Sequence, residues 1–118
     1  MDAKKMETGE AELPLEISPR EAAEVLKKEK GVLLVDVREA WEYEICRIAG
    51  AKLIPMGTIP AHLQELDTED EVICYCHHGM RSMDVAVWLR GQGVRSARSL
   101  AGGIERWSAE IDGSVPRY

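Results

Sequence analysis

Two short apolar stretches limit what this chain can fold into more than any other feature of its sequence. Residues 32–37 and residues 72–75 are nearly continuous runs of apolar side chains. A strand with one face in water alternates apolar and polar residues, whereas a strand covered on both faces does not. Strands covered on both faces are typical of parallel sheets, so the two runs are predicted to be central strands of such a sheet.

Helix-forming segments alternate with the strands along the chain. We expect strands at residues 13–17, 32–37, 51–54, 72–75 and 96–100, and helices at residues 19–30, 39–46, 61–66 and 83–90, with a final helix through residue 107. This alternation predicts an α/β fold with a mainly parallel sheet and helices on both faces. Residues 13–118 are expected to form this single domain, and the polar residues 1–12 a flexible N-terminal tail.

The charge of the chain excludes some classes of partner. Its 118 residues contain 15 basic and 21 acidic side chains, a formal net charge of −6. Nucleic acids and anionic membrane surfaces attract basic proteins, so we expect neither as a partner. No apolar run approaches the roughly 20 residues that a membrane-spanning helix needs, and no N-terminal apolar segment indicates a signal peptide. We therefore expect a cytoplasmic protein.

The chain has three cysteines, and their positions differ in kind. A small odd number without an export signal does not indicate a disulfide framework. Cys74 lies within an apolar strand, and Cys46 lies near a helix end without a companion group, so both are predicted to be core thiols. Cys76 follows a central strand and precedes a helix. Ligands of parallel sheets bind at such strand ends, which makes Cys76 the candidate reactive thiol.

Residues 76–82 have three features that favour a thiolate. Backbone N–H groups of a tight loop can surround the sulfur, and the helix that follows adds partial positive charge. Arg81 brings a full positive charge. Gly79 permits a backbone conformation that other residues resist, and Ser82 is expected to cap the helix or to hydrogen-bond the sulfur. Since the thiolate is the reactive form of cysteine, the loop predicts a nucleophile at Cys76.

The loop also resembles a known active site. The spacing of Cys76, Gly79, Arg81 and Ser82 is similar to that of the active-site loop of the rhodanese family, and three further segments resemble family signatures in the right order: residues 34–43, 48–55 and 100–107. The resemblance spans roughly residues 15–110. It implies a parallel five-stranded sheet flanked by helices on both faces. It also implies transfer of sulfane sulfur from a donor to a thiophilic acceptor through a cysteine persulfide.

The resemblance assigns roles to residues and partners. Cys76 is the expected catalytic residue, and the expected substrate-binding residues are His77, His78, Gly79, Met80, Arg81 and Ser82. The expected donor is thiosulfate or a persulfide, and the acceptor is cyanide, a small thiol or a protein. No cofactor is expected. Asp36 and Arg38, at the carboxyl end of the first central strand, are predicted to form a supporting ion pair.

Several points stay open in the sequence. His77 and His78 either line the sulfur pocket or bind water. No metal is expected there, because adjacent residues point apart and no second cluster completes a tetrahedral set. Arg47 and Ala49 stand where the family usually has histidine and proline, and the direction of the Arg47 charge is not predicted.

Two other functions compete with sulfur transfer. One is a non-catalytic binding module, and the intact loop argues against it. The other is a phosphatase. The loop contains six residues from Cys76 to Arg81, as in the sulfurtransferases, whereas related phosphatases and arsenate reductases have one more. Both the intact loop and its length favour the sulfurtransferase.

Overall fold

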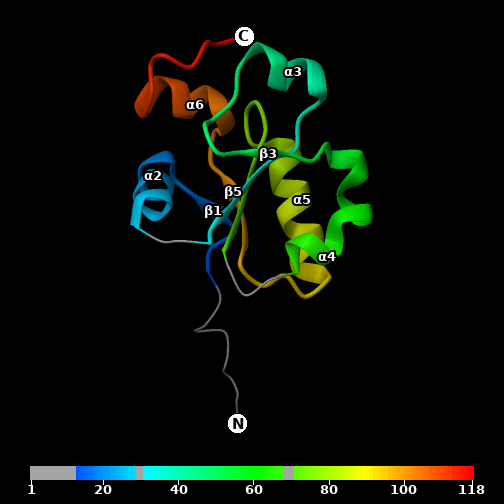
Figure 1. Cartoon of the computed structure of the whole chain (residues 1–118). Coiled ribbons are helices and arrows are strands. Elements are labelled where there is room, and N and C mark those ends of the chain that lie inside the picture. Colours follow the sequence, from blue (N-terminus) through cyan, green and yellow to red (C-terminus); the bar gives the residue numbers. More distant parts are fainter. Residues whose placement is uncertain (1–12, 29–30, 68–70) are drawn as a thin grey trace.

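Five parallel strands form one sheet in the order β1-β5-β4-β2-β3 (Figure 1). The structure is a computed structural model that describes residues 13–28, 31–67 and 71–118, so the expected tail at 1–12 lies outside the described residues. The elements are β1 (Glu16–Ile17), α2 (Pro19–Lys28), β2 (Leu33–Asp36), α3 (Ala40–Ile45), β3 (Lys52–Leu53), η2 (Met56–His62), α4 (Leu63–Leu66), β4 (Val72–Tyr75), α5 (Met80–Gly91), β5 (Ala97–Leu100) and α6 (Gly103–Glu110). None of the helices in the described ranges is long and apolar enough to cross a membrane.

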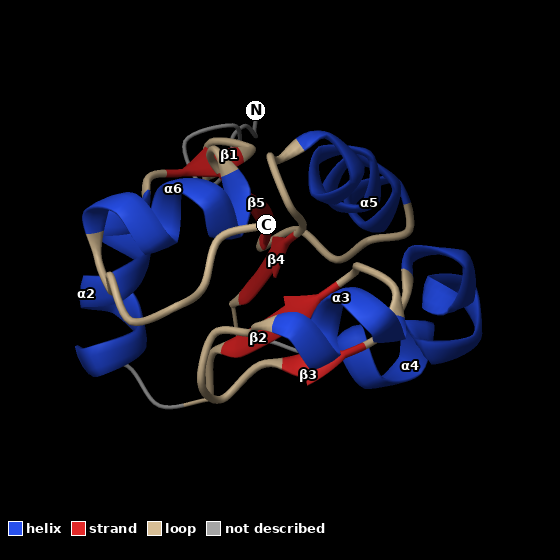
Figure 2. Ribbon diagram, turned by 90° about the horizontal axis from the view of Figure 1, so that it is seen from above, coloured by secondary structure: helices blue, strands red, loops and turns tan. Residues whose placement is uncertain are grey.

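Helices cover both faces of the sheet, as predicted (Figure 2). Successive side chains of a strand point to opposite faces, and β4 shows this directly. Val72 and Cys74 pack into the cluster that contains residues of α5, η2 and α4. Ile73 and Tyr75 pack into the cluster that contains residues of α2 and α6. The continuous apolar run in β4 therefore has the predicted cause: both faces of the strand are buried.

The observed elements differ from the predicted ones mainly at their ends. The predicted helix at 61–66 is a 3-10 helix over Met56–His62 followed by the single turn of α4. Helix α5 begins at Met80, three residues before the predicted start. Gly79 explains this earlier start, since it adopts φ +107° and lets the chain turn into the helix within the 76–82 segment.

The loops that follow β2 and β4 lie side by side at the carboxyl edge of the sheet. Asp36 is in register with Tyr75, the last residue of β4. From β2 the chain passes through α3 to the edge strand β3, and from β4 it passes through α5 to β5 on the other side. The connections that leave the neighbouring strands β2 and β4 thus run toward opposite edges of the sheet. Parallel sheets bind ligands at such a point, so the fold places the Cys76 loop where a site is expected.

Helix α6 is attached directly to the backbone of the Cys76 loop. The Ile104 N–H donates to the carbonyl of Cys76 at 2.9 Å, and the Glu105 N–H donates to the carbonyl of His77 at 3.1 Å. Gly103 makes this approach possible. A Cβ atom on Gly103 would lie 2.4 Å from the His77 carbonyl oxygen and 2.5 Å from that of Cys76, and the residue has φ +62°. The glycine thus sets how closely α6 and the loop approach.

Gly103→Ala is expected to destabilise the protein by at least about 2 kcal/mol, because it adds a backbone clash to a left-handed conformation that alanine resists. The measurement is the free energy of unfolding from urea titration followed by circular dichroism. Gly91→Ala is the matched control, since a Cβ at Gly91 meets nothing within 4 Å. Equal stability of the two variants would show that α6 does not depend on close backbone contact with the loop.

Candidate active site

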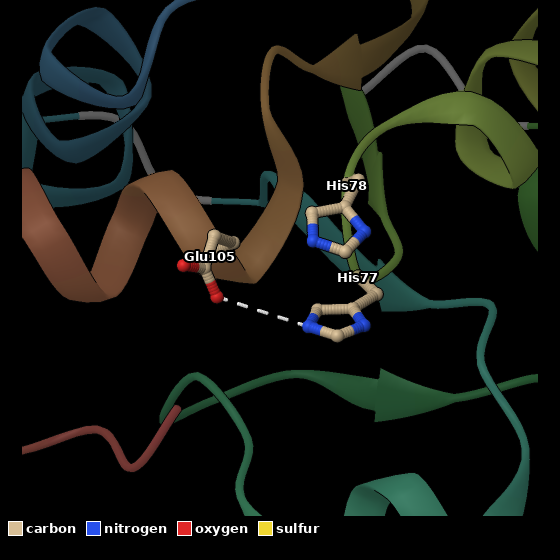
Figure 3. Close-up of side chains that lie close together, drawn as sticks. All are labelled: His77, His78 and Glu105. Carbon is tan, nitrogen blue, oxygen red and sulfur yellow. Dashed lines mark ion pairs between the residues drawn. The ribbon is translucent and has the colours of Figure 1, made fainter. Parts of the chain in front are cut away.

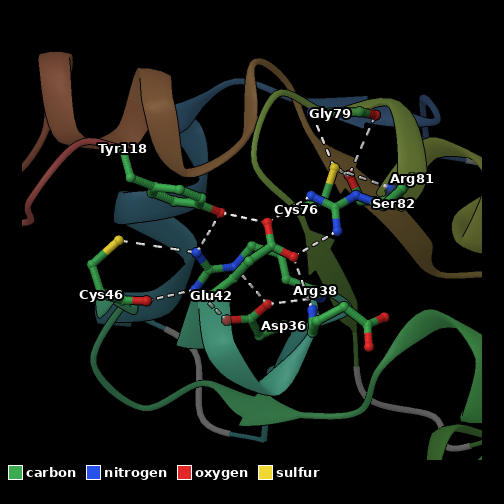
Figure 4. Close-up of polar contacts among 10 residues, drawn as sticks. Asp36, Arg38, Glu42, Cys46, Cys76, Gly79, Arg81, Ser82 and Tyr118 are labelled. Carbon is green, nitrogen blue, oxygen red and sulfur yellow. Dashed lines mark hydrogen bonds and ion pairs between the residues drawn. The ribbon is translucent and has the colours of Figure 1, made fainter. Parts of the chain in front are cut away.

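The Cys76 sulfur lies at the centre of its loop and accepts hydrogen bonds from the backbone (Figure 4). The Gly79 N–H donates to the Cys76 Sγ at 3.1 Å and the Ser82 N–H donates at 3.3 Å. The Ser82 hydroxyl lies 3.4 Å from the same sulfur. Backbone donors at the start of a helix favour negative charge, so this arrangement can stabilise an anionic sulfur.

A pair of hydroxyl groups supports the sulfur from inside the protein. The Ser82 Oγ lies 2.7 Å from the Ser99 Oγ, and both side chains are fully buried. Ser82 sits inside α5 and Gly79 is the N-cap, so the expectation that Ser82 caps the helix is wrong, while the expected contact with the sulfur is present. Sequence reasoning missed Ser99. Its only signal is a small polar residue in a buried strand, in register with Cys74.

Arg81 forms an ion pair with the carboxylate of Glu42, which was not among the predicted site residues. Arg81 donates two hydrogen bonds to Glu42, at 2.8 and 2.9 Å, and the Glu42 side chain is only 4% exposed. These bonds from Arg81 lower the pKa of Glu42 to about 2, and the bonds to Glu42 raise the pKa of Arg81. Arg81 therefore does bring the expected positive charge to the loop, but as part of an ion pair whose guanidinium is partly open to solvent.

The predicted ion pair between Asp36 and Arg38 is present and completely buried. Arg38 donates to both Asp36 oxygens, at 2.9 and 2.7 Å, and neither side chain is exposed. Burial opposes the charge on Arg38, but hydrogen bonds to Asp36 and Tyr118 outweigh it and raise its pKa. Arg38 also donates to the Cys46 carbonyl at 2.6 Å, and the Cys46 sulfur lies 4.0 Å from its Nη1. Cys46 is buried as predicted, but it does have a companion group.

Tyr118 joins the two ion pairs, and nothing in the sequence pointed to it. Its hydroxyl accepts from Arg38 Nη1 at 2.8 Å and donates to Glu42 Oε2 at 2.7 Å (Figure 4). Burial raises the pKa of Tyr118 to about 12, so the phenol stays protonated. Tyr118 has no local pattern to mark it, because its position follows from the path of the chain after α6. Glu42 did carry a signal, as an acidic residue between Trp41 and Tyr43 in a signature segment.

The two histidines of the loop stack on each other and do not point apart, which corrects the expectation for adjacent residues (Figure 3). Their ring centroids are 3.8 Å apart, and the Tyr118 ring stacks on the other side of His77 at 3.9 Å. Burial, together with the nearby His78, lowers the pKa of His77. His77 is partly buried and His78 is exposed. Whether either one contacts a substrate stays a prediction.

His77, His78 and Glu105 form a group of possible metal ligands among the described residues. Their donor atoms lie within 4.8 Å of one another, and His77 Nε2 lies 3.8 Å from a Glu105 oxygen. The two rings are nearly parallel, at 24°, so the in-plane lone pairs of their nitrogens run side by side and do not converge on one ion. The other Glu105 oxygen pairs with Arg117. The expectation that no metal binds stays a prediction.

Three further residues that the sequence singled out lie in different places. Met80 is the first residue of α5 and is 81% exposed, and its substrate-binding role stays a prediction. Cys74 is fully buried, and burial raises the pKa of its thiol to about 12, which agrees with an inert core cysteine. The Arg47 guanidinium lies over the Tyr43 ring, 4.3 Å from its centroid. The charge of Arg47 is thus directed toward α3.

Known proteins resemble this chain in sequence and in fold. The family model described as "Rhodanese-like domain" matches residues 18–110. The chain is 40% identical over 89 residues to the chloroplastic rhodanese-like/PpiC domain-containing protein 12 of Arabidopsis thaliana, which covers 72% of this chain and 30% of that protein. It is 38% identical over 94 residues to the thiosulfate sulfurtransferase GlpE of Coxiella burnetii, which covers 80% of this chain and 87% of GlpE.

A crystal structure of a rhodanese-like domain protein from Staphylococcus aureus has the same fold. It superimposes with a TM-score of 0.75 at 31% identity and covers 89% of this chain and 99% of the other. The chain spans less than a third of the Arabidopsis protein but nearly all of GlpE. The parallel five-stranded sheet expected from the sequence is therefore confirmed, and the chain belongs to the rhodanese-like domain family.

Proposed function

We propose that this protein is a sulfurtransferase that carries sulfane sulfur as a persulfide on Cys76. The observation that carries the proposal is the set of backbone N–H groups, from Gly79 and Ser82, that converge on the Cys76 sulfur. Such donors stabilise an anionic sulfur before the reaction and after it. The similarity to GlpE, a thiosulfate sulfurtransferase, supports the same reaction class.

The proposed reaction has two displacement steps at sulfur. The Cys76 thiolate attacks the outer sulfur of thiosulfate; a new S–S bond forms, the old S–S bond breaks, and its electron pair leaves with sulfite. The terminal sulfur of the persulfide is then attacked by cyanide or a thiolate. The electron pair of the Cys76 S–S bond returns to Cys76, which regenerates the thiolate. A persulfide can replace thiosulfate as donor; its S–S bond breaks and a thiolate leaves with the electron pair.

Arg81 is the proposed anchor for an anionic donor. Its guanidinium belongs to the same loop as Cys76 and is about one-third exposed, while Glu42 holds it from the buried side. A planar guanidinium can present further N–H groups to an incoming anion after two of them bind the carboxylate. Arg81 therefore offers hydrogen bonds as well as charge at the mouth of the loop.

The test of the function is mass spectrometry of the protein after incubation with thiosulfate. We expect the peptide that contains Cys76 to gain one sulfur atom, and cyanide to remove it with formation of thiocyanate. A parallel assay with p-nitrophenyl phosphate separates sulfur transfer from phosphatase chemistry. Phosphatase turnover without any persulfide would contradict the proposal, and the absence of both reactions would favour a binding module.

Cys76→Ser is expected to lower thiosulfate:cyanide transfer by at least about 100-fold, because a serine hydroxyl is a far poorer sulfur acceptor than a thiolate. The measurement is the rate of thiocyanate formation. Cys74→Ala is the control, since it removes the neighbouring buried thiol and leaves the loop intact. Persistent activity in the serine variant, with loss of activity in the Cys74 variant, would overturn the assignment.

Arg81→Ala is expected to lower kcat/KM for thiosulfate by about 100-fold, and Arg81→Lys by about tenfold, because a point charge replaces only part of a planar fork. Cysteine persulfide, which carries less negative charge than thiosulfate, is the comparison donor. Its kcat/KM is expected to fall less in both variants. An equal loss for the two donors would show that Arg81 supports the loop without recognising the anion.

The ion pair between Glu42 and Arg81 makes the free energy of unfolding depend on pH. The pKa of Glu42 is about 2 in the folded protein and 4.5 ordinarily, so its ionised form stabilises the fold above about pH 4.5, and this contribution disappears as the pH falls toward 2. The difference in unfolding free energy between wild type and Glu42→Gln is expected to shrink over that range. Urea titrations at a series of pH values measure it. A difference that stays constant would contradict the pairing.

A further inference from the structure

The Tyr118 side chain contacts several groups at the carboxyl edge of the sheet, although Tyr118 is far from Cys76 in the sequence. Its ring stacks on His77, at 3.9 Å and 8° between planes, and meets the Trp41 ring edge-on at 6.3 Å. Its hydroxyl lies between Arg38 and Glu42. The chain after α6 thus returns over the strand ends and brings a tyrosine beside the proposed sulfur site (Figure 4).

The hydroxyl of Tyr118 has a fixed direction because of its two partners. An arginine can only donate hydrogen bonds and an ionised carboxylate can only accept them. The hydroxyl must therefore accept from Arg38 and donate to Glu42. No other side chain of the described residues bonds to both groups, so this hydroxyl is the link between the buried Asp36–Arg38 pair and the Glu42–Arg81 pair.

The position of Glu42 depends on this bond. Its Oε1 accepts from Arg81 and from the Glu39 N–H, and its Oε2 accepts from Arg81 and from Tyr118. Four hydrogen bonds thus hold the two oxygens in place. Removal of the hydroxyl leaves Oε2 with the single bond from Arg81, and the carboxylate can then turn and carry the guanidinium with it.

We propose that Tyr118 is a positioning residue of the sulfur-transfer site, whose hydroxyl fixes Glu42 so that Glu42 directs the Arg81 guanidinium to the mouth of the Cys76 loop. This inference rests on the proposed function for its role in catalysis, but the placement of Arg81 is a physical property that can be measured without sulfur transfer. Tyr118 acts through two other side chains and takes no part in bond making.

Tyr118→Phe is the test variant, because it removes the hydroxyl and keeps the ring that stacks on His77. Tyr43→Phe is the matched control; Tyr43 contacts Arg47 and lies outside the network that reaches Arg81. In sulfur transfer, Tyr118→Phe is expected to raise KM for thiosulfate by about fivefold while kcat changes less than about twofold. In the Arg81→Ala background the same substitution is expected to have no further effect on KM.

A second measurement does not depend on the proposed function. Iodoacetate and iodoacetamide alkylate the same thiol, but only iodoacetate is anionic, so the ratio of their rates at Cys76 reports positive charge at the mouth. Mass spectrometry of the Cys76 peptide gives both rates. Tyr118→Phe is expected to lower the ratio by about fivefold, and Tyr43→Phe to leave it unchanged.

The outcomes separate the two proposals. A lowered ratio in a protein that transfers no sulfur would remove the proposed function and keep the role of Tyr118 in placing Arg81. An unchanged ratio in Tyr118→Phe, or the same decrease in the Arg81→Ala background, would overturn that role. Thermal unfolding of each variant shows whether the fold is retained at the assay temperature.

Discussion

Hydrogen bonds between the Cys76 loop and the start of α6 organise the whole carboxyl edge of the sheet. The carbonyl groups of Cys76 and His77 point outward to the N–H groups of Ile104 and Glu105. Further along the same loop, the N–H groups of Gly79 and Ser82 point inward to the sulfur. A loop whose first carbonyl groups are held on one side has fewer ways to turn its later N–H groups. The attachment of α6 therefore helps to shape the cradle around the sulfur.

Buried charge at this edge is arranged as a chain of partners. Asp36 binds Arg38, Arg38 binds the Tyr118 hydroxyl, and through it Glu42 and Arg81 are connected. Burial of an unpaired charge costs on the order of several kcal/mol, so the buried charges of Asp36, Arg38 and Glu42 depend on their oppositely charged partners. Among the four charged side chains, Arg81 is the one that is substantially open to solvent. The network thus holds one partly exposed guanidinium, that of Arg81, in place through contacts with buried charged groups.

The sequence predicted most of the fold because the fold depends on short-range patterns. Continuous apolar runs marked the buried strands β2 and β4, and Gly79 and Arg81 marked the loop around Cys76. The prediction of α5 was late by a turn, since a glycine with positive φ at its cap gave no apolar signal. The predicted helix at 61–66 is α-helical over Leu63–Leu66, but its first two residues end the 3-10 helix Met56–His62, and apolar spacing does not separate these two similar local structures.

The site was predicted less completely, because its supporting contacts are long-range. Glu42 meets Arg81 only after β2 and β4 pair, and Tyr118 meets Arg38 only after α6 packs on the sheet. Ser99 reaches Ser82 across a strand pair. No local pattern in the sequence predicts these long-range contacts. Resemblance to a family can identify the loop, but the residues that hold the loop become visible only in three dimensions.

The buried position of Cys74 has a consequence for the proposed persulfide on Cys76. Both side chains face the same core cluster, and residues two apart on an extended chain have Cβ atoms separated by roughly 6–7 Å. A disulfide needs a Cβ separation of about 4 Å, so the two cysteines cannot join without distortion of β4. Cys74 is also protonated, with a pKa of about 12. A nearby thiol that can neither ionise nor reach Cys76 would not release the outer sulfur of the proposed persulfide as hydrogen sulfide.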